Sequence, residues 1–249
     1  MRPLTLLLIA LVLATAACST SAPEGPPAAS ETDHGALVDD LREAVAAVAT
    51  EQAAADTRLL AALEAVRAVD EGLAPLRIVD TIDDAVAAWS DADAAFRRAE
   101  VTDLRTGYLE TAAAVDRARE TLATTRSQLT SAWEVSYLDA EDEVLATVRT
   151  YAESADRLAQ LLERHWPAYV KVADQVSSFV ERRWFFRSPQ EALDALTVEL
   201  DTLLIDLATA QRELAQYRRE REAAAQAVNE ATAEAVAVWN RRPSPGTAG

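Results

Sequence analysis

The sequence predicts an all-α protein, an elongated antiparallel up-down bundle of about four long, coiled-coil-like helices. Half of the 249 residues are hydrophobic, which is enough for a sizeable core. Only six Gly and nine Pro are present, so long elements joined by few turns are expected. The clearest single signal is an apolar heptad pattern that runs through residues 189–239.

The helix predicted over residues 189–239 is the longest. Ser188, Pro189 and Glu191 occupy the positions of an N-cap, a first helical residue and a capping-box acid. About 50 residues at about 1.5 Å each make a helix of about 75 Å, which needs partner helices of similar length. Arg221 alone interrupts its apolar seam, and the stretch 217–221, in which basic residues alternate with an acid, is expected to be a solvated face. The seam comprises Leu193, Leu196, Leu200, Leu203, Leu207, Ala210, Leu214, Tyr217, Ala224, Val228, Ala231, Ala235 and Val238.

Two more helices have clear boundaries. The first is predicted over residues 35–71, because its apolar spacing ends at Gly72 and Pro75. The third is predicted to start at an Asp139 N-cap. It contains Pro167, but the apolar spacing continues past this residue without a change of phase. A kinked continuous helix is therefore expected there, and a stop at the proline is the alternative.

The second predicted helix has a change of register. Its apolar spacing starts at Ile82, slips by one residue after Phe96 and resumes at Val101. A one-residue insertion is absorbed either by a π-bulge within a continuous helix or by a break, and Gly107 nearby permits both. We expect the continuous helix, ending near Ala132, with the break as the alternative.

Charge and motif content exclude several functions. The chain has 24 basic and 41 acidic residues, a net charge of −17, so it lacks the positive surplus that nucleic-acid binding requires. It has no Gly-rich phosphate loop and no serine-elbow motif. Neither histidine stands near a plausible nucleophile. We therefore expect no enzyme activity and no cofactor.

A di-iron site of the kind found in helical bundles needs two inward Glu-x-x-His pairs. Glu31 and His34 have this spacing but fall in a predicted tether, and His165 has Leu162 at the position of the acid. The single cysteine, Cys18, allows neither an intrachain disulfide nor a cysteine-based zinc site. No metal site is expected.

The N-terminal residues 1–17 have the anatomy of a secretory signal peptide, with Arg2 followed by an apolar run that is too short to span a membrane. The sequence Thr15-Ala16-Ala17-Cys18 resembles the lipobox of bacterial lipoproteins, although Thr15 replaces the usual Leu. The resemblance implies that Cys18 is diacylated and becomes the first residue of the mature protein. Ordinary cleavage after Ala16, which leaves Cys18 as a free thiol, is the alternative.

Four regions follow from these boundaries. Residues 1–17 form the signal peptide, and residues 18–34 form the lipid anchor with a flexible tether rich in Ser, Thr, Pro and Ala. Residues 35–242 form the helical bundle, and residues 243–249 form a disordered tail. The expected location is the extracytoplasmic face of the cell membrane, with the lipid as anchor.

The connection before the last helix is the predicted contact site for a partner or a membrane. Three consecutive aromatic residues cannot all face one core across a short turn, so at least one ring should be exposed. Exposed aromatics beside arginine are typical of binding hot spots. In the alternative, the rings cover the end of the bundle as a lid, and the arginines pair with Glu181 and Glu191. The site comprises Arg182, Arg183, Trp184, Phe185, Phe186 and Arg187.

Together these features predict a lipid-anchored binding or scaffolding module of the cell envelope. Its expected partners are the membrane, through the lipid, and an unknown envelope protein, and an oligomer is possible. A solute-binding accessory lipoprotein of a transport system is the alternative, but the many alanines in the seams leave little room for a pocket of about 300 Å³ or more. Trp133 and Trp239 are expected either at the rim of the core or at a membrane interface. The aromatic residues on or beside the apolar seams are expected in the core, namely Trp89, Trp166, Tyr169 and Phe179.

Overall fold

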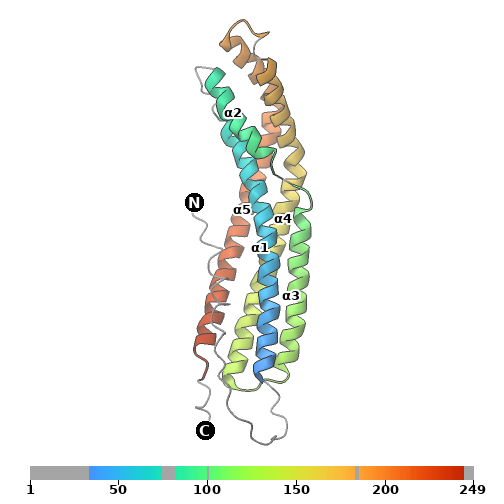
Figure 1. Ribbon diagram of the computed structural model, residues 1–249, viewed down its shortest axis with the longest axis vertical. Helices are drawn as coiled ribbons and strands as arrows, with labels where there is room; N and C mark the ends of the chain where they lie inside the picture. Colours follow the sequence, from blue (N-terminus) through green and yellow to red (C-terminus); the bar gives the residue numbers. More distant parts are fainter. Residues whose placement is uncertain (1–33, 75–81, 100, 183–184, 244–249) are drawn as a thin grey trace, which may run out of the picture. The chain divides into compact units, whose positions relative to one another are not determined.

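The computed structural model describes residues 34–74, 82–99, 101–182 and 185–243. These residues form helices joined by turns and contain no strand, so the predicted all-α class is confirmed. The long helices pack pairwise as an up-down bundle. The helices are α1 (His34–Leu73), α2 (Ile82–Phe96), α3 (Leu104–Arg126), α4 (Ala132–Arg182) and α5 (Pro189–Asn240) (Figure 1).

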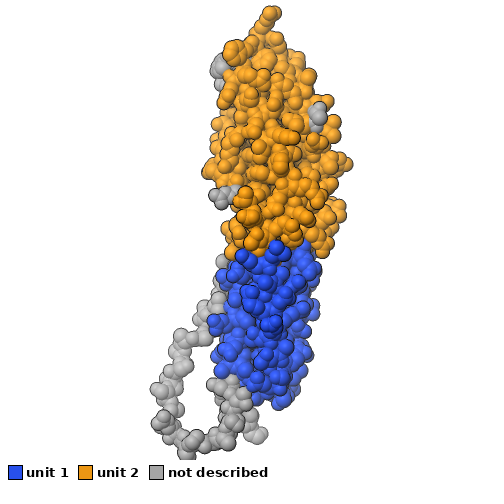
Figure 2. Space-filling view, turned by 90° about the vertical axis from the view of Figure 1, so that its right-hand side faces the viewer, with its two compact units in different colours: residues 1–53, 109–153, 223–249 blue, residues 54–108, 154–222 orange. Residues whose placement is uncertain are grey.

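The chain divides into two compact units, which Figure 2 colours separately. Unit 1 comprises the described residues within 1–53, 109–153 and 223–249. Unit 2 comprises those within 54–108 and 154–222. Helices α1, α3, α4 and α5 each contribute residues to both units, so each unit has its own core built from the same long helices.

Contacts between α1 and α5 show that these two helices are antiparallel. In unit 2, the Arg221 guanidinium of α5 lies 3.1 Å from Asp56 Oδ1 of α1. In the same unit, the Gln211 side chain donates a hydrogen bond of 2.6 Å to Asp70. The residue number in α1 therefore rises from 56 to 70 while that of its partner in α5 falls from 221 to 211.

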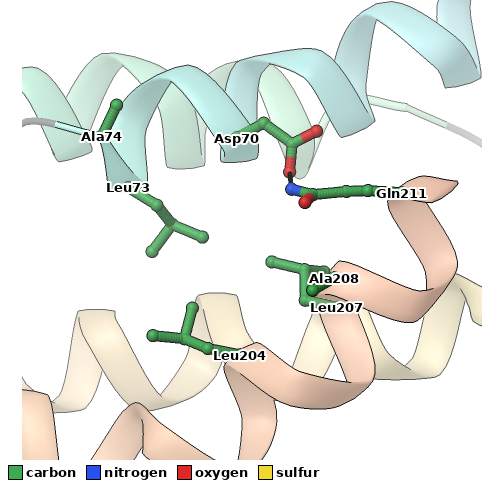
Figure 3. Close-up of a pocket in the computed structure, with 7 residues that line it drawn as sticks. All are labelled: Asp70, Leu73, Ala74, Leu204, Leu207, Ala208 and Gln211. Atoms are coloured by element: carbon green, nitrogen blue, oxygen red, sulfur yellow. Dashed lines mark hydrogen bonds between the residues drawn. The ribbon is translucent and has the colours of Figure 1, made fainter. Parts of the chain in front are cut away.

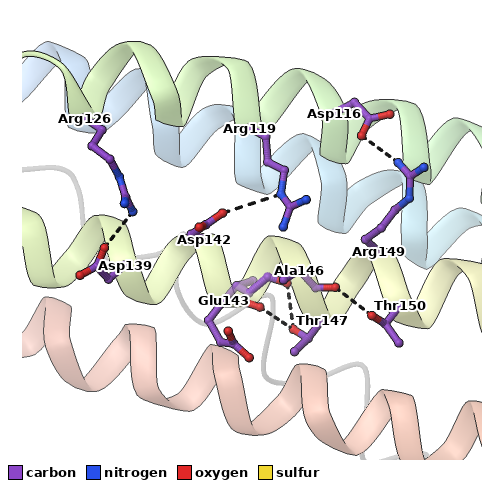
Figure 4. Close-up of polar contacts among 11 residues, drawn as sticks. Asp116, Arg119, Arg126, Asp139, Asp142, Glu143, Ala146, Thr147, Arg149 and Thr150 are labelled. Carbon is purple, nitrogen blue, oxygen red and sulfur yellow. Dashed lines mark hydrogen bonds and ion pairs between the residues drawn. The ribbon is translucent and has the colours of Figure 1, made fainter.

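An antiparallel ladder of ion pairs connects α3 and α4 in unit 1 (Figure 4). The paired side chains are largely exposed, so each pair contributes little to stability, but together they match one register of the two helices. The pairs are Arg126–Asp139 at 2.8 Å, Arg119–Asp142 at 3.7 Å and Asp116–Arg149 at 2.8 Å.

The prediction that Asp139 caps the third long helix is wrong, because α4 already begins at Ala132. Its cap is a box in which the Glu134 N–H donates to Ser131 Oγ (3.3 Å) and the Ser131 N–H donates to Glu134 Oε2 (2.9 Å). Glu134 Oε1 lies 3.0 Å from Nδ1 of His34, which begins α1 instead of lying in the tether. Burial raises the pKa of Glu134, but its hydrogen bonds with Ser131 and His34 outweigh this and lower the pKa overall.

The expected continuous second helix is also wrong. Helix α2 ends at Phe96 and α3 begins at Leu104, so a break absorbs the change of register. At the break Asp103 adopts a φ of 58°, a left-handed conformation that Asp tolerates better than most residues. The Asp103 carbonyl accepts a hydrogen bond of 3.2 Å from the Thr106 N–H at the start of α3.

Gly107 lies inside α3 and serves a different purpose from the one considered in the sequence. A Cβ atom at this position would lie 2.9 Å from the Ala55 Cβ and 3.2 Å from the Ala55 Cα in α1. It would also lie 2.7 Å from the Arg58 guanidinium. Helices α1 and α3 therefore approach so closely at this point that only glycine fits.

The predicted core aromatics are confirmed. Trp89, Tyr169 and Phe179 are buried in unit 2, and Trp166 stacks on Phe96 at 4.5 Å between ring centroids. Burial of such rings contributes more apolar area per residue than any other side chain. Helix α4 continues through Pro167, so the expected continuation past this residue is confirmed.

Gly107→Ala should lower the free energy of unfolding by about 1–3 kcal/mol, because the added methyl group must displace the backbone of Ala55. Urea unfolding monitored by circular dichroism measures the change. Glu110→Ala, at an exposed position of the same helix, is the control and should change stability by less than about 0.5 kcal/mol. Equal stability of the glycine and alanine proteins would contradict the close approach of α1 and α3.

Candidate interaction site

The turn between α4 and α5 presents an isolated aromatic side chain. Phe185 is 86% exposed, the highest value among the exposed large hydrophobic residues of the described chain. Arg182 and Arg187 beside it are also exposed. The expectation of at least one exposed ring in this turn is therefore met by Phe185.

The neighbouring Phe186 behaves differently. It is half-buried, and its ring packs against Phe179 of α4 with 5.5 Å between centroids. The lid alternative thus applies to Phe186 and not to Phe185. Two adjacent residues of the same type divide the two roles, one packing on the bundle and the other facing solvent.

Described residues on both sides of Phe185 make polar contacts. The Arg182 guanidinium donates to Glu199 Oε2 at 3.0 Å, rather than pairing with Glu181 or Glu191 as the lid alternative expected. Glu191 instead accepts a hydrogen bond of 3.0 Å from the backbone N–H of Arg187. The Glu191 N–H donates to Ser188 Oγ at 3.2 Å, which confirms the predicted cap of α5.

The remaining predicted site residues, Cys18, Arg183 and Trp184, lie outside the described residues. A solvent-exposed aromatic ring beside guanidinium groups is the composition that dominates the energy of many protein interfaces.

Arg221, which interrupts the apolar seam of α5, is paired inside unit 2. Its guanidinium lies 3.1 Å from Asp56 Oδ1, and the two side chains are only 15% and 17% exposed. The Tyr108 hydroxyl donates to the same carboxylate at 2.8 Å. The stretch around Arg221 was expected to be a solvated face, and this is wrong for Arg221 and for Arg218, whose guanidinium donates to the Leu63 carbonyl at 3.4 Å.

A small pocket of about 150 Å³ opens between the end of α1 and the middle of α5 in unit 2 (Figure 3). Asp70 and Gln211, joined by their hydrogen bond, form its polar side, and leucine side chains form the apolar side. Burial raises the pKa of Asp70, although the Gln211 hydrogen bond and the Arg218 charge partly offset this. The pocket is lined by Asp70, Leu73, Ala74, Leu204, Leu207, Ala208 and Gln211.

The tryptophans of unit 1 lie at the rim of the core. The Trp133 indole N–H donates to the Val238 carbonyl at 3.3 Å, so its polar atom is used within the bundle. Arg42 and Arg242 both stack on Trp239, at 4.6 and 4.5 Å from its centroid. These contacts favour the rim of the core over a membrane interface.

Two apolar residues that the sequence analysis did not single out are exposed on α5. Val198 is 78% exposed and Ile205 is 64% exposed. They stand seven residues apart, so they share one face of the helix. The sequence feature that could have predicted this exposed pair is the heptad spacing of two β-branched residues outside the core seam.

Neither histidine belongs to a metal cluster in the structure: His34 pairs with Glu134, and His165 lies 2.8 Å from Glu213. Within the described ranges no group of three or more His, Cys, Asp or Glu side chains could hold a metal ion. No helix among the described residues is both long and apolar enough to cross a membrane.

No protein-family model, curated protein or solved structure matches the chain. Functional inference therefore rests on the chemistry of the residues themselves. Among the described residues, the three most exposed large hydrophobic side chains are Phe185 at the turn and Val198 and Ile205 on α5, followed by Leu109, Val135 and Leu60.

Asp56→Ala should lower the free energy of unfolding by about 3 kcal/mol, because it leaves the largely buried guanidinium of Arg221 without its carboxylate. Urea unfolding measures the loss. The double variant Asp56→Leu, Arg221→Met is the matched control and should recover most of the stability, since neither partner of the pair is then left as a single buried charge. A loss below about 1 kcal/mol for Asp56→Ala would contradict the internal role of the pair.

Proposed function

We propose that this protein is a lipid-anchored, extracytoplasmic helical-bundle lipoprotein that acts as a binding or scaffolding module of the cell envelope. The observation that carries the proposal is the turn between α4 and α5, where Phe185 is 86% exposed between Arg182 and Arg187. Burying a phenylalanine side chain is worth about 1.5–3 kcal/mol, and the fold leaves this gain to a partner.

Two contacts next to Phe185 suit it to recognition. Phe186 packs on Phe179, and the Ser188 cap fixes the start of α5. A contact residue that is already ordered loses little conformational entropy on binding. Arg182, Phe185 and Arg187, called the tip from here on, therefore offer an aromatic and cationic contact beside ordered residues.

A protein partner suits this site better than a lipid surface. The chain has a net charge of −17, and anionic headgroups repel an acidic protein. The proposed lipid on Cys18 supplies membrane attachment, and the composition of residues 19–33 predicts a tether of at most about 45 Å. The tip is then free to contact another protein of the envelope.

The solute-binding alternative has less support. The pocket between α1 and α5 has a volume of about 150 Å³, whereas small-molecule sites typically have about 300–1,000 Å³. Its lining also lacks aromatic residues. The pocket can accept one side chain more readily than a whole nutrient molecule.

Lipidation is tested by growth of cells with labelled palmitate. The wild-type protein should carry the label and partition into the membrane fraction, and Cys18→Ser should lose both properties because the acylated thiol is absent. Ser19→Ala, one residue further on, is the control and should keep the label. Label retained by Cys18→Ser would overturn the anchor assignment.

The tip is tested with two neighbouring phenylalanines. Phe185→Ser should abolish capture of an envelope protein by chemical crosslinking on intact cells and leave the melting temperature unchanged, because this ring faces solvent. Phe186→Ser should lower stability by about 1–2 kcal/mol, because this ring packs on Phe179. Capture unaffected by Phe185→Ser, or a large fall in its melting temperature, would count against the tip as contact site.

A further inference from the structure

The C-terminal end of α1 carries negative charge where a helix favours positive charge. Asp70 and Glu71 lie in its last turn, which contains no basic residue. The carbonyl groups of a last helical turn have no partner inside the helix, so the macrodipole is negative at this end. Both carboxylates therefore stand at an unfavourable position, and each needs positive charge from elsewhere.

The two carboxylates differ in how that charge is supplied. Glu71 is exposed and pairs with Arg67 of the same helix at 2.7 Å. Asp70 is half-buried and accepts the hydrogen bond of 2.6 Å from Gln211. The charge of Arg218 acts on Asp70 from a greater distance, while its guanidinium donates to a backbone carbonyl of α1. Within the described chain, Asp70 takes part in no ion pair and is thus a desolvated carboxylate without a cation in contact.

The pocket beside Asp70 has two unlike sides (Figure 3). Leu73 and Leu204 project into the space on one side, and Asp70 and Gln211 lie on the other. Because Gln211 donates to Asp70 through its amide nitrogen, its amide oxygen is a second acceptor. Asp70 is the one charged residue among the described residues of the lining. The pocket therefore joins a negative charge and hydrogen-bond acceptors to an aliphatic wall.

We propose that the pocket beside Asp70 is a binding site for a primary ammonium group on a short alkyl chain. The ammonium group donates to the Asp70 carboxylate and the Gln211 amide oxygen, and the methylene groups lie on Leu73 and Leu204. The volume of about 150 Å³ suits such a group, because a cavity of this size accepts benzene and butylammonium has fewer non-hydrogen atoms. This site is separate from the tip, so the inference goes beyond the proposed function and does not depend on it.

Other ligand classes fit this lining less well. A divalent metal ion is held by about six to eight oxygen ligands, and no cluster of metal-ligating side chains is present among the described residues. A guanidinium group forms its strongest pair with both oxygens of a carboxylate, but one oxygen of Asp70 already accepts from Gln211. A neutral ligand or an anion leaves the Asp70 charge uncompensated. An ammonium group offers one compact charge and several donors.

Two sources present this chemistry, namely a lysine side chain of a protein partner and a free small amine. Both place the same ammonium group against Asp70, and they differ only in what the alkyl chain is attached to. Binding of the ammonium group is therefore measured first with a defined probe, and the natural source is identified second.

The first test titrates n-butylammonium chloride into the full-length protein in detergent, with NMR chemical shifts as the readout and sodium chloride as the background. The wild-type protein should show saturable shifts around the pocket. Butanol, which has the same chain without the charge, should bind about tenfold more weakly, because it lacks the charge-assisted hydrogen bond.

Two neighbouring variants assign the binding to one carboxylate. Asp70→Asn should weaken butylammonium binding by about tenfold, because it removes the charge and keeps the shape of the side chain. Glu71→Gln, which removes the adjacent exposed charge, is the matched control and should leave the affinity unchanged. Circular dichroism verifies that both variants are folded.

Three results would overturn the site: no saturable shifts with butylammonium, equal affinity for butylammonium and butanol, or equal affinity of Asp70→Asn and the wild type. The comparison of butylammonium with butanol uses the wild-type protein alone. It therefore decides the question without a variant that has to fold.

The second test adds a water-soluble carbodiimide to intact cells, because this reagent condenses a carboxylate and an adjacent amine into an amide. Mass spectrometry then examines Asp70 in the purified protein. An amide to a lysine of another protein identifies a partner side chain, and an amide to a small amine identifies a free ligand, so either product supports the site. Asp70 without an amide, in protein whose exposed Glu110 has reacted with the reagent, would overturn occupancy of the site in the cell.

Discussion

Burial of one long apolar stripe per helix is the constraint on which the rest of this structure depends. Helices α1, α4 and α5 have 40, 51 and 52 residues, and each has an apolar seam that it cannot cover by itself. Short connections make neighbours along the chain antiparallel, so each seam meets another of similar length. Alanine and glycine in the seams then bring the backbones close, as at Gly107 against Ala55.

The few polar groups inside the bundle act on register rather than on bulk stability. The Asp56 carboxylate meets both Arg221 and Tyr108, which come from α5 and α3. An apolar seam alone tolerates a shift by one heptad, but such a shift would separate these three side chains and leave charge unpaired in the core. We therefore regard this group as the device that selects one alignment of α1, α3 and α5 in unit 2.

The proposed contact site lies where the bundle has no structural use for an apolar group. Phe186 is used by the fold, and Phe185 next to it is not. Val198 and Ile205 likewise face solvent, whereas the next exposed positions at heptad spacing on the same helix, 212, 219 and 226, are Arg, Arg and Gln. Apolar exposure that departs from the pattern of its own helix is more informative than exposure alone, because single exposed hydrophobic residues are common.

The sequence by itself determined the class of fold, the antiparallel order, the cap and extent of α5 and the continuation of α4 through Pro167. Those properties depend on periodicity and on local hydrogen bonds, which neighbouring residues define. Caps can still be overlooked, as the Ser131–Glu134 box was when Asp139 offered a competing cap.

Only the tertiary structure decided how the change of register after Phe96 is absorbed, because a bulge and a break differ in energy through packing against other helices. Packing against other helices also decided three further features: the inward direction of Arg221, the different roles of Phe185 and Phe186, and the pocket beside Asp70. Each depends on which residue of a distant helix lies opposite, and heptad spacing carries no information about that residue. The physical reason is that periodicity defines a face, whereas its neighbours are defined by the alignment of whole helices.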